Sequence, residues 1–148
     1  ADEALAVPGT TAIEYYQAHR AYLAAGQNEK AAPLIRAFER LSDDRESALI
    51  MGVRQACAEG RVADADKIFA EVAEGSNSRW LFLKTLGLHE EAREALVYLD
   101  KPATLSSLAG FLIYPMFDHN EFPLLKAELE SQGIERPAAR TVPYQCQR

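Results

Sequence analysis

Three segments of the sequence align without gaps, and each begins with a glycine. They are GQNEKAAPLIRAF (26–38), GRVADADKIFAEV (60–72) and GLHEEAREALVYL (87–99). In each segment an alanine follows the glycine by five residues, a large apolar residue lies four further on, and another lies three beyond that. This i, i+4, i+7 spacing puts the three side chains on one face of a helix, where the small alanine allows a neighbouring helix to approach closely. A helix repeated in this way predicts an all-α chain.

The glycines mark the turn between the two helices of each repeat. Gly26 and Gly60 are 34 residues apart, and Gly87 follows 27 residues later, so the third copy has a shortened first helix. Apolar residues recur at helical spacing before each glycine. The first of these helices begins with Thr11 and Glu14, a predicted capping box whose two side chains satisfy free amides of the first turn.

Over residues 11–102 the chain resembles the tetratricopeptide repeat family in its glycine turn, its following alanine and its 34-residue period. The resemblance implies a right-handed superhelical stack of antiparallel helix hairpins, an α-solenoid of about seven or eight helices. The family usually has another glycine seven residues before the turn, where this chain has His19, Val53 and Trp80. Helix crossing angles are therefore expected to depart from the family's standard. The stretch 114–137 is also similar to the end of helical-repeat arrays in bacterial signalling proteins, which implies a sensory or docking module.

A single domain is expected, because 148 residues are enough for one hydrophobic core. A second predicted capping box, Asp118 to Glu121, precedes a helix expected from 122 to 132. The predicted divisions of the domain 1–148 are repeat 1 at 11–41, repeat 2 at 44–75, a short repeat 3 at 77–101, a modified terminal hairpin at 103–133 and an extended tail at 134–148.

Charge and hydropathy argue against several classes of partner. The formal net charge is −6, which disfavours direct binding to nucleic acid and to an anionic membrane surface. No apolar run approaches the roughly 18 residues that a membrane-spanning helix needs. The sequence begins with Ala rather than Met, so we expect a processed protein or a part of a larger one. A soluble, extracytoplasmic (periplasmic) location is favoured over the cytoplasm, and the oligomeric state is left open.

The two cysteines, Cys57 and Cys146, lie 89 positions apart and have no metal-ligand spacing. A pair of this kind does not make a disulfide framework. One Cys57–Cys146 bridge would form in an oxidising compartment, whereas Cys57 equally suits a buried helical position as a free thiol. The sequence leaves both alternatives open.

No catalytic or metal-binding motif is found in the sequence. GLHEEAREAL begins like a zinc-binding helix, but Arg93 occupies the position, four residues after His89, where such a helix needs its second histidine. Asp118, His119 and Glu121 are better explained as helix-capping residues than as metal ligands. We therefore expect no metal, no cofactor and no enzymatic activity.

The expected binding surface is the concave groove formed by the first helix of each repeat, where residues ten, six and three before each glycine face inward. The predicted contact residues are Tyr16, Arg20, Arg54 and Lys84. The planar fork of arginine suits carboxylates, and a tyrosine adds a rigid contact. These residues predict a non-enzymatic interaction or scaffolding module of a bacterial regulator that holds a protein or peptide, with an acidic peptide as one candidate. The alternative, in which these charges are solvated or paired within the chain, stays open.

Two other functions remain open at this point. A small-molecule-sensing domain would have its pocket between the last hairpins, near Tyr114, Phe117 and Phe122. An enzyme would need a buried cluster of ionisable groups that the sequence alone does not assemble.

Overall fold

The computed structural model describes residues 9–148, so the first eight residues of the predicted domain lie outside the described part. Within residues 9–148 every regular element is helical, which confirms the predicted all-α class. None of these helices is both long enough and apolar enough to cross a bilayer. The α-helices are α2 (Ala12–Ala24), α3 (Asn28–Leu41), α4 (Arg45–Ala58), α5 (Val62–Phe69), α6 (Arg79–Thr85), α7 (His89–Leu96), α8 (Leu105–Ala109) and α9 (Pro123–Ser131), and the 3₁₀ helices are η1 (Val97–Leu99), η2 (Gly110–Ile113) and η3 (His119–Glu121).

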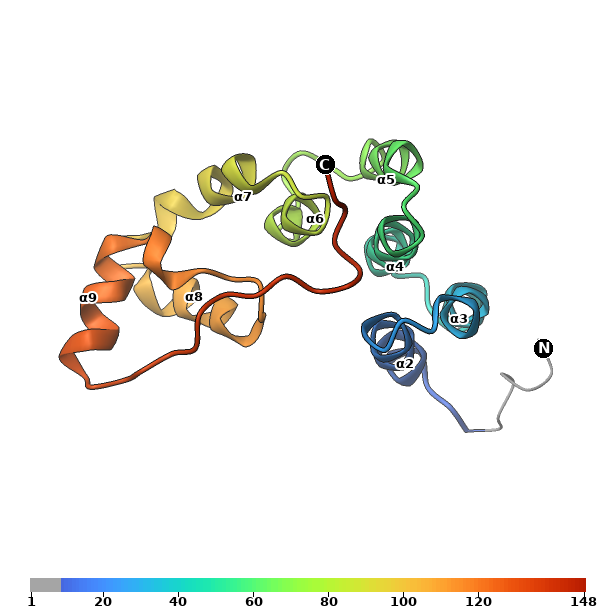
Figure 1. The fold of residues 1–148 in the computed structure, drawn as a ribbon, viewed down its shortest axis with the longest axis horizontal. Helices are drawn as coiled ribbons and strands as arrows, with labels where there is room; N and C mark the ends of the chain where they lie inside the picture. Colours follow the sequence, from blue (N-terminus) through green and yellow to red (C-terminus); the bar gives the residue numbers. More distant parts are fainter. Residues whose placement is uncertain (1–8) are drawn as a thin grey trace.

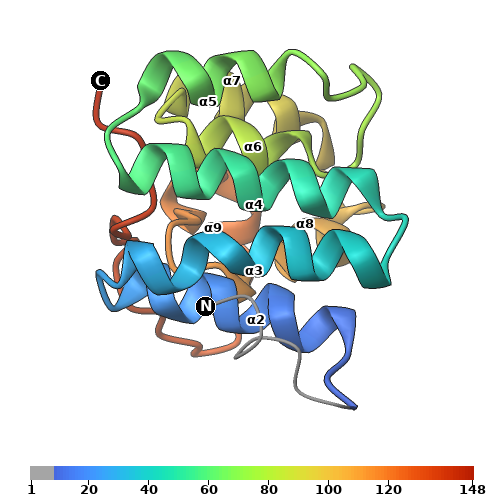
Figure 2. The same ribbon diagram turned by 90° about the vertical axis from the view of Figure 1, so that its right-hand side faces the viewer.

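The helices before residue 97 pack as three consecutive hairpins. Helix α2 packs against α3, α4 against α5, and α6 against α7. The first helices of the hairpins also contact one another, α2 with α4 and α4 with α6. Figure 2 shows α2, α3, α4 and α5 lying side by side. In Figure 1 the hairpins follow one another around an arch, with α2 and α3 at one end and α8 and α9 at the other.

Each of these hairpins turns at a glycine in the left-handed conformation, with φ of +74° at Gly26, +75° at Gly60 and +78° at Gly87. Only glycine adopts this φ without strain. In all three turns the residue after the glycine donates its N–H to the carbonyl five residues earlier, the Schellman arrangement that ends a helix. These bonds run from Gln27 N to Tyr22 O (2.8 Å), from Arg61 N to Ala56 O (2.8 Å) and from Leu88 N to Leu83 O (2.9 Å). The three aligned segments therefore share one turn geometry.

The aligned alanines are fully buried in all three hairpins. Ala31, Ala65 and Ala92 are each 0% exposed. A larger side chain at these positions would separate the paired helices, because protein interiors are close-packed. The repeat pattern in the sequence thus corresponds to a shared packing position.

The predicted capping box at the start of α2 is confirmed. The N–H of Thr11 donates to Glu14 Oε2 at 2.7 Å, and the N–H of Glu14 donates to Thr11 Oγ1 at 3.4 Å. These two bonds satisfy amides that have no partner within the helix.

The second predicted capping box, Asp118 to Glu121, is wrong. The Asp118 carboxylate caps the 3₁₀ helix η3, and α9 begins only at residue 123. The free amides of α9 are instead capped by Asp100, whose carboxylate accepts from Leu124 N at 3.1 Å and from Leu125 N at 3.0 Å. The capping carboxylate comes from a distant part of the chain, so local spacing could not identify it.

Candidate functional site

The inner face is the surface made by residues ten, six and three before the three turn glycines. Its members are Tyr16, Arg20 and Leu23, then Ile50, Arg54 and Cys57, then Asn77, Leu81 and Lys84. The C-terminal segment, residues 134–148, runs from the end of α9 past α8 and finishes close to α6 (Figure 1). Its last part covers one end of the inner face.

Three successive tail residues cover the three positions nearest the turns. Tyr144 packs in one cluster with Leu23, Cys146 is bonded to Cys57, and Gln145 Nε2 donates to the carbonyl of Lys84 at 3.1 Å. The covered residues Leu23, Cys57 and Lys84 are 0%, 5% and 9% exposed.

Cys57 and Cys146 form a disulfide, with their Cα atoms 4.3 Å apart. Of the two alternatives that the sequence leaves open, the structure therefore contains the bridge. Both cysteines are 5% exposed. The bridge ties the end of the tail to α4, across 89 residues of sequence.

The tail also caps the C-terminal end of α6. Its donors are Gln145 Nε2 to Lys84 O, Cys146 N to Thr85 O and Arg148 Nε to Leu86 O, at 3.1, 2.8 and 2.6 Å. Thr85 O and Leu86 O have no intrahelical partner, so the bonds from Cys146 and Arg148 satisfy groups that would otherwise be buried and unpaired, whereas Lys84 O also accepts from the N–H of Gly87 at 3.1 Å. The backbones approach so closely that a Cβ on Gly87 would lie 2.8 Å from the carbonyl oxygen of Cys146. The side chain of Arg148 also forms an ion pair with Asp66.

A buried arginine lies at the centre of the inner face. Arg54 is 1% exposed, and its Nη1 donates to the hydroxyl of Tyr16 at 3.0 Å. Its guanidinium carbon lies 5.3 Å from the ring centroid of Tyr16 and 5.5 Å from that of Tyr144. Within residues 9–148 no carboxylate pairs with Arg54, and its Nε has no hydrogen-bond partner. Two tyrosine rings therefore hold this charge in place of a counter-ion.

The structure brings together only part of the predicted contact set. Tyr16 and Arg54 touch, whereas Lys84 lies under the tail with its Nζ 3.9 Å from Glu121 Oε1. Arg20 is half-buried and donates to Gln17, three residues earlier in α2. The predicted contact residues therefore do not form one open surface: Arg54 is buried against Tyr16 and Tyr144, and Lys84 is buried beside Glu121.

Three side chains near the tail have shifted pKa values. Burial lowers the pKa of His19 to about 4, a hydrogen bond with Gln55 opposes this shift, and the charge of Arg54 adds to it. Burial also raises the pKa of Glu121, against the opposing effect of Lys84, and lowers the pKa of His89 with the help of Lys84. Within residues 9–148 no group of three His, Cys, Asp or Glu side chains is arranged to hold a metal ion.

The other end of the inner face is open. A cavity of about 580 Å³ lies there. It is lined by the residues that stand ten positions before the three turn glycines, which are Tyr16, Ile50 and Asn77. Asp44 and Glu46 also line this cavity, and within residues 9–148 its walls contain no lysine or arginine. Both carboxylates are engaged: Asp44 accepts from the N–H of Ser47 at 3.1 Å, and Glu46 accepts from the hydroxyl of Ser76.

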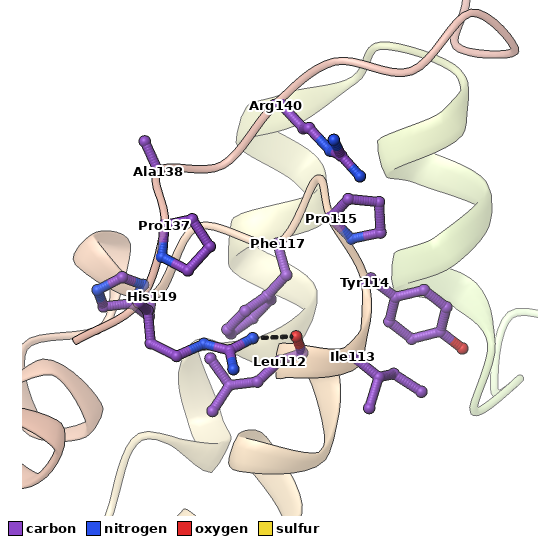
Figure 3. A pocket seen from close by; sticks show the side chains of 10 residues that line it. Leu112, Ile113, Tyr114, Pro115, Phe117, His119, Pro137, Ala138 and Arg140 are labelled. Atoms are coloured by element: carbon purple, nitrogen blue, oxygen red, sulfur yellow. Dashed lines mark hydrogen bonds between the residues drawn. The ribbon is translucent and has the colours of Figure 1, made fainter. Parts of the chain in front are cut away.

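A second cavity, of about 380 Å³, lies between residues 112–119 and the tail (Figure 3). It lies beside the residues predicted for a small-molecule pocket, and of these Tyr114 and Phe117 line it. Phe122 does not line it, because this residue is 2% exposed and stacks against Phe117 with ring centroids 5.4 Å apart.

Sequence reasoning missed the roles of Tyr144, Gln145 and Arg148, which it placed in an extended tail. One signal was present: an aromatic residue and the second cysteine stand within three residues of each other near the end of the sequence. Such residues are seldom left exposed, so their presence indicates docking of the tail.

No family model matches the chain, and neither the curated proteins nor the solved structures contain a significant match to it. Any assignment of function therefore depends on the geometry of the inner face and of the two cavities.

Proposed function

We propose that this protein is a non-enzymatic interaction module that holds an extended polypeptide segment on its inner face. One observation carries the proposal: residues 141–148 of the chain itself lie on this face without helical structure. Their contacts are those that a bound peptide would use, with a buried aromatic anchor at Tyr144, donors to helix carbonyls and an ion pair at Arg148.

The proposed architecture is a right-handed TPR-like stack with repeats at 11–41, 44–75 and 77–101, a modified hairpin at 103–133 and a tail at 134–148. The common turn geometry and the contacts of α4 with both α2 and α6 support it. In such a stack the first helices of the hairpins form the concave surface that binds partners. The proposed setting is an extracytoplasmic part of a bacterial regulator, and the disulfide supports an oxidising compartment.

In this proposal the tail and a partner segment compete for the same residues. Tyr16, Arg54 and Lys84 would contact a partner after the tail has moved, and Arg20 would lie at the edge of the site. The tail has a large advantage while the bridge is closed, because a tethered segment has a high effective concentration. A partner of similar chemistry would therefore bind best when the bridge is open.

Disulfide capture tests this proposal in the full chain. The C146S variant leaves Cys57 as a thiol, which can attack an activated disulfide on a synthetic peptide TVPYQCQR and release the activating thiol. We expect faster capture of this peptide than of a scrambled peptide, as measured by mass spectrometry. The tyrosine and the backbone of the peptide would make the contacts that Tyr144 and the tail backbone make, and these contacts would position its cysteine. A peptide with alanine in place of the tyrosine should react at an intermediate rate. Equal rates for all three peptides would contradict recognition of an extended segment.

A second candidate function, small-molecule sensing, is favoured by the cavity beside Tyr114 and Phe117. A ligand that binds the folded state alone raises the melting temperature. Sensing further requires that the ligand change the release of the tail, which amide hydrogen exchange of residues 141–148 would measure. Binding without any change in that exchange would argue against sensing.

A further inference from the structure

The cavity in Figure 3 has two walls from distant parts of the chain. One wall is the stretch from Leu112 to Phe117, with His119 beside it, and the other is the tail from Arg136 to Arg140. Its volume of about 380 Å³ is within the range of small-molecule sites. The tail wall is held by two hydrogen bonds, from Arg136 Nη2 to Leu112 O at 2.6 Å and from Arg140 N to Pro115 O at 3.0 Å.

The charges around this cavity are opposite in sign to those of the whole chain. Within residues 9–148 its walls hold Arg136, Arg140 and His119 but no aspartate or glutamate, although the chain carries a net charge of −6. Neither arginine takes part in an ion pair within residues 9–148. Arg136 donates to Leu112 O through one nitrogen of its guanidinium, which leaves further N–H groups for an anion. A guanidinium fork matches the geometry of a carboxylate or phosphate.

The remainder of the cavity is apolar and rigid. Phe117 is 5% exposed, stacks on Phe122 and meets the edge of Trp80 with ring centroids 5.7 Å apart. Tyr114 also contacts Trp80, at 5.5 Å between centroids. These contacts preform an aromatic wall, which favours a ligand with an apolar body because little ordering is needed on binding.

We propose that this cavity binds a small organic acid. Its apolar body would lie against Tyr114 and Phe117, and its anionic group would be held by the guanidinium of Arg136 at one end of the cavity or by that of Arg140 at the other (Figure 3). The proposal rests on the second candidate function, ligand sensing, and adds the chemistry of the ligand. The larger cavity beside Tyr16 is a weaker ligand site, because both of its carboxylates already accept hydrogen bonds within the chain.

The test uses the full, disulfide-bonded chain and measures binding by isothermal titration and by NMR shifts. The probe is 3-phenylpropionate, and its neutral isostere 3-phenylpropionamide is the matched control. We expect saturable shifts in residues 112–117 and 136–140 with the acid, and binding at least about tenfold weaker with the amide, since charge-assisted hydrogen bonds are worth roughly 1.5–3 kcal/mol. A third probe, 2-phenylethylphosphonate, decides whether a carboxylate or a phosphate-like anion is preferred, and tighter binding of either acid supports the proposal.

Variants then assign the site. R136Q/R140Q should weaken binding of 3-phenylpropionate at least about tenfold. The matched control is R36Q/R40Q, which removes the same charge from two exposed arginines of α3, and it should leave binding unchanged. Absence of binding by all probes, equal binding of acid and amide, or equal losses in the two double variants would overturn the proposal. Binding of the acid without any change in the exchange of residues 141–148 would refute sensing and leave the anion site in place.

Discussion

The two ends of the inner face differ in what covers them. At the end near the turns, Leu23, Cys57 and Lys84 are buried by the tail, whereas at the other end Tyr16 and Ile50 line an open cavity. The backbone explains the difference. The carbonyls of Thr85 and Leu86 at the end of α6 need donors and the tail supplies them, but the start of α4 is already capped by its own Asp44. Unsatisfied helix ends thus determine where an extended segment binds.

The comparison also shows that the tail is part of the hydrophobic core. Cys146 belongs to the main core cluster, and Tyr144 forms a separate buried cluster with Leu23 and Ala31. Release of the tail would expose these residues and remove the donors to Thr85 O and Leu86 O at the end of α6. Stability and access to the inner face are therefore coupled, and the following experiments measure that coupling.

The largest expected effect comes from the bridge at the covered end. C57A/C146A should lower the free energy of unfolding by about 4 kcal/mol, because the bridge closes a loop of 89 residues. Urea denaturation measures this loss. Relative to the wild type, the variant should also speed amide hydrogen exchange more in residues 141–148 than in α2. The reduced wild-type chain is the control and should match the variant. A loss below about 1 kcal/mol with the tail still protected would mean that other contacts hold the tail.

The next effect concerns His19, which is 0% exposed beneath the covered end. Its pKa of about 4 in the folded chain lies below the ordinary 6.5, so the unfolded chain binds the proton more tightly between these values. Its neutral form therefore stabilises the fold fully above pH 6.5, and this contribution is lost as the pH falls towards 4. We expect a loss of about 3 kcal/mol across that window.

Urea denaturation at several pH values measures the slope. H19Q should flatten it, because this variant removes the group whose pKa differs between the folded and the unfolded chain. Equal slopes in H19Q and the wild type would show that another group controls the acid response.

Local features of the fold were predictable from the sequence. The turn glycines, the buried alanines and the Thr11–Glu14 box depend on residues within one turn or one helix pair, so their spacing is visible in the chain. The same locality explains why the all-α class was predictable.

Non-local features were not predictable in the same way. Asp100 caps a helix 24 residues away, and the covering of Arg54 depends on Tyr144, 90 positions further along the chain. Tyr16, Arg54 and Lys84 were placed on the correct helices as an inward-facing set, but nothing in their spacing shows that the tail would bury two of them. The choice between a free Cys57 and a bridge likewise depends on where the tail docks.

The turn glycines allow a smaller and more specific test of the tail. Gly60 and Gly87 have nearly the same φ, but a Cβ meets nothing within 4 Å at Gly60 and meets Cys146 O at 2.8 Å at Gly87. G60A should cost about 1 kcal/mol through its backbone conformation alone, and G87A about 2 kcal/mol because the tail must also shift. In the C57A/C146A background the cost of G87A should fall to that of G60A. If the difference persists there, contact with the tail is not its cause.

The smallest expected effect tests whether the two ends of the inner face are linked through Tyr16. Its ring lines the open cavity, and its hydroxyl accepts from Arg54 Nη1 beneath the tail. Y16F keeps the ring but leaves that donor buried without a partner, so we expect a loss of about 1 kcal/mol and faster exchange in 141–148. Y22F is the matched control, because the Tyr22 hydroxyl makes no such bond to Arg54. A loss in Y16F without faster exchange of the tail would mean that Tyr16 stabilises α4 alone, and that the open end can bind a ligand without disturbing the covered one.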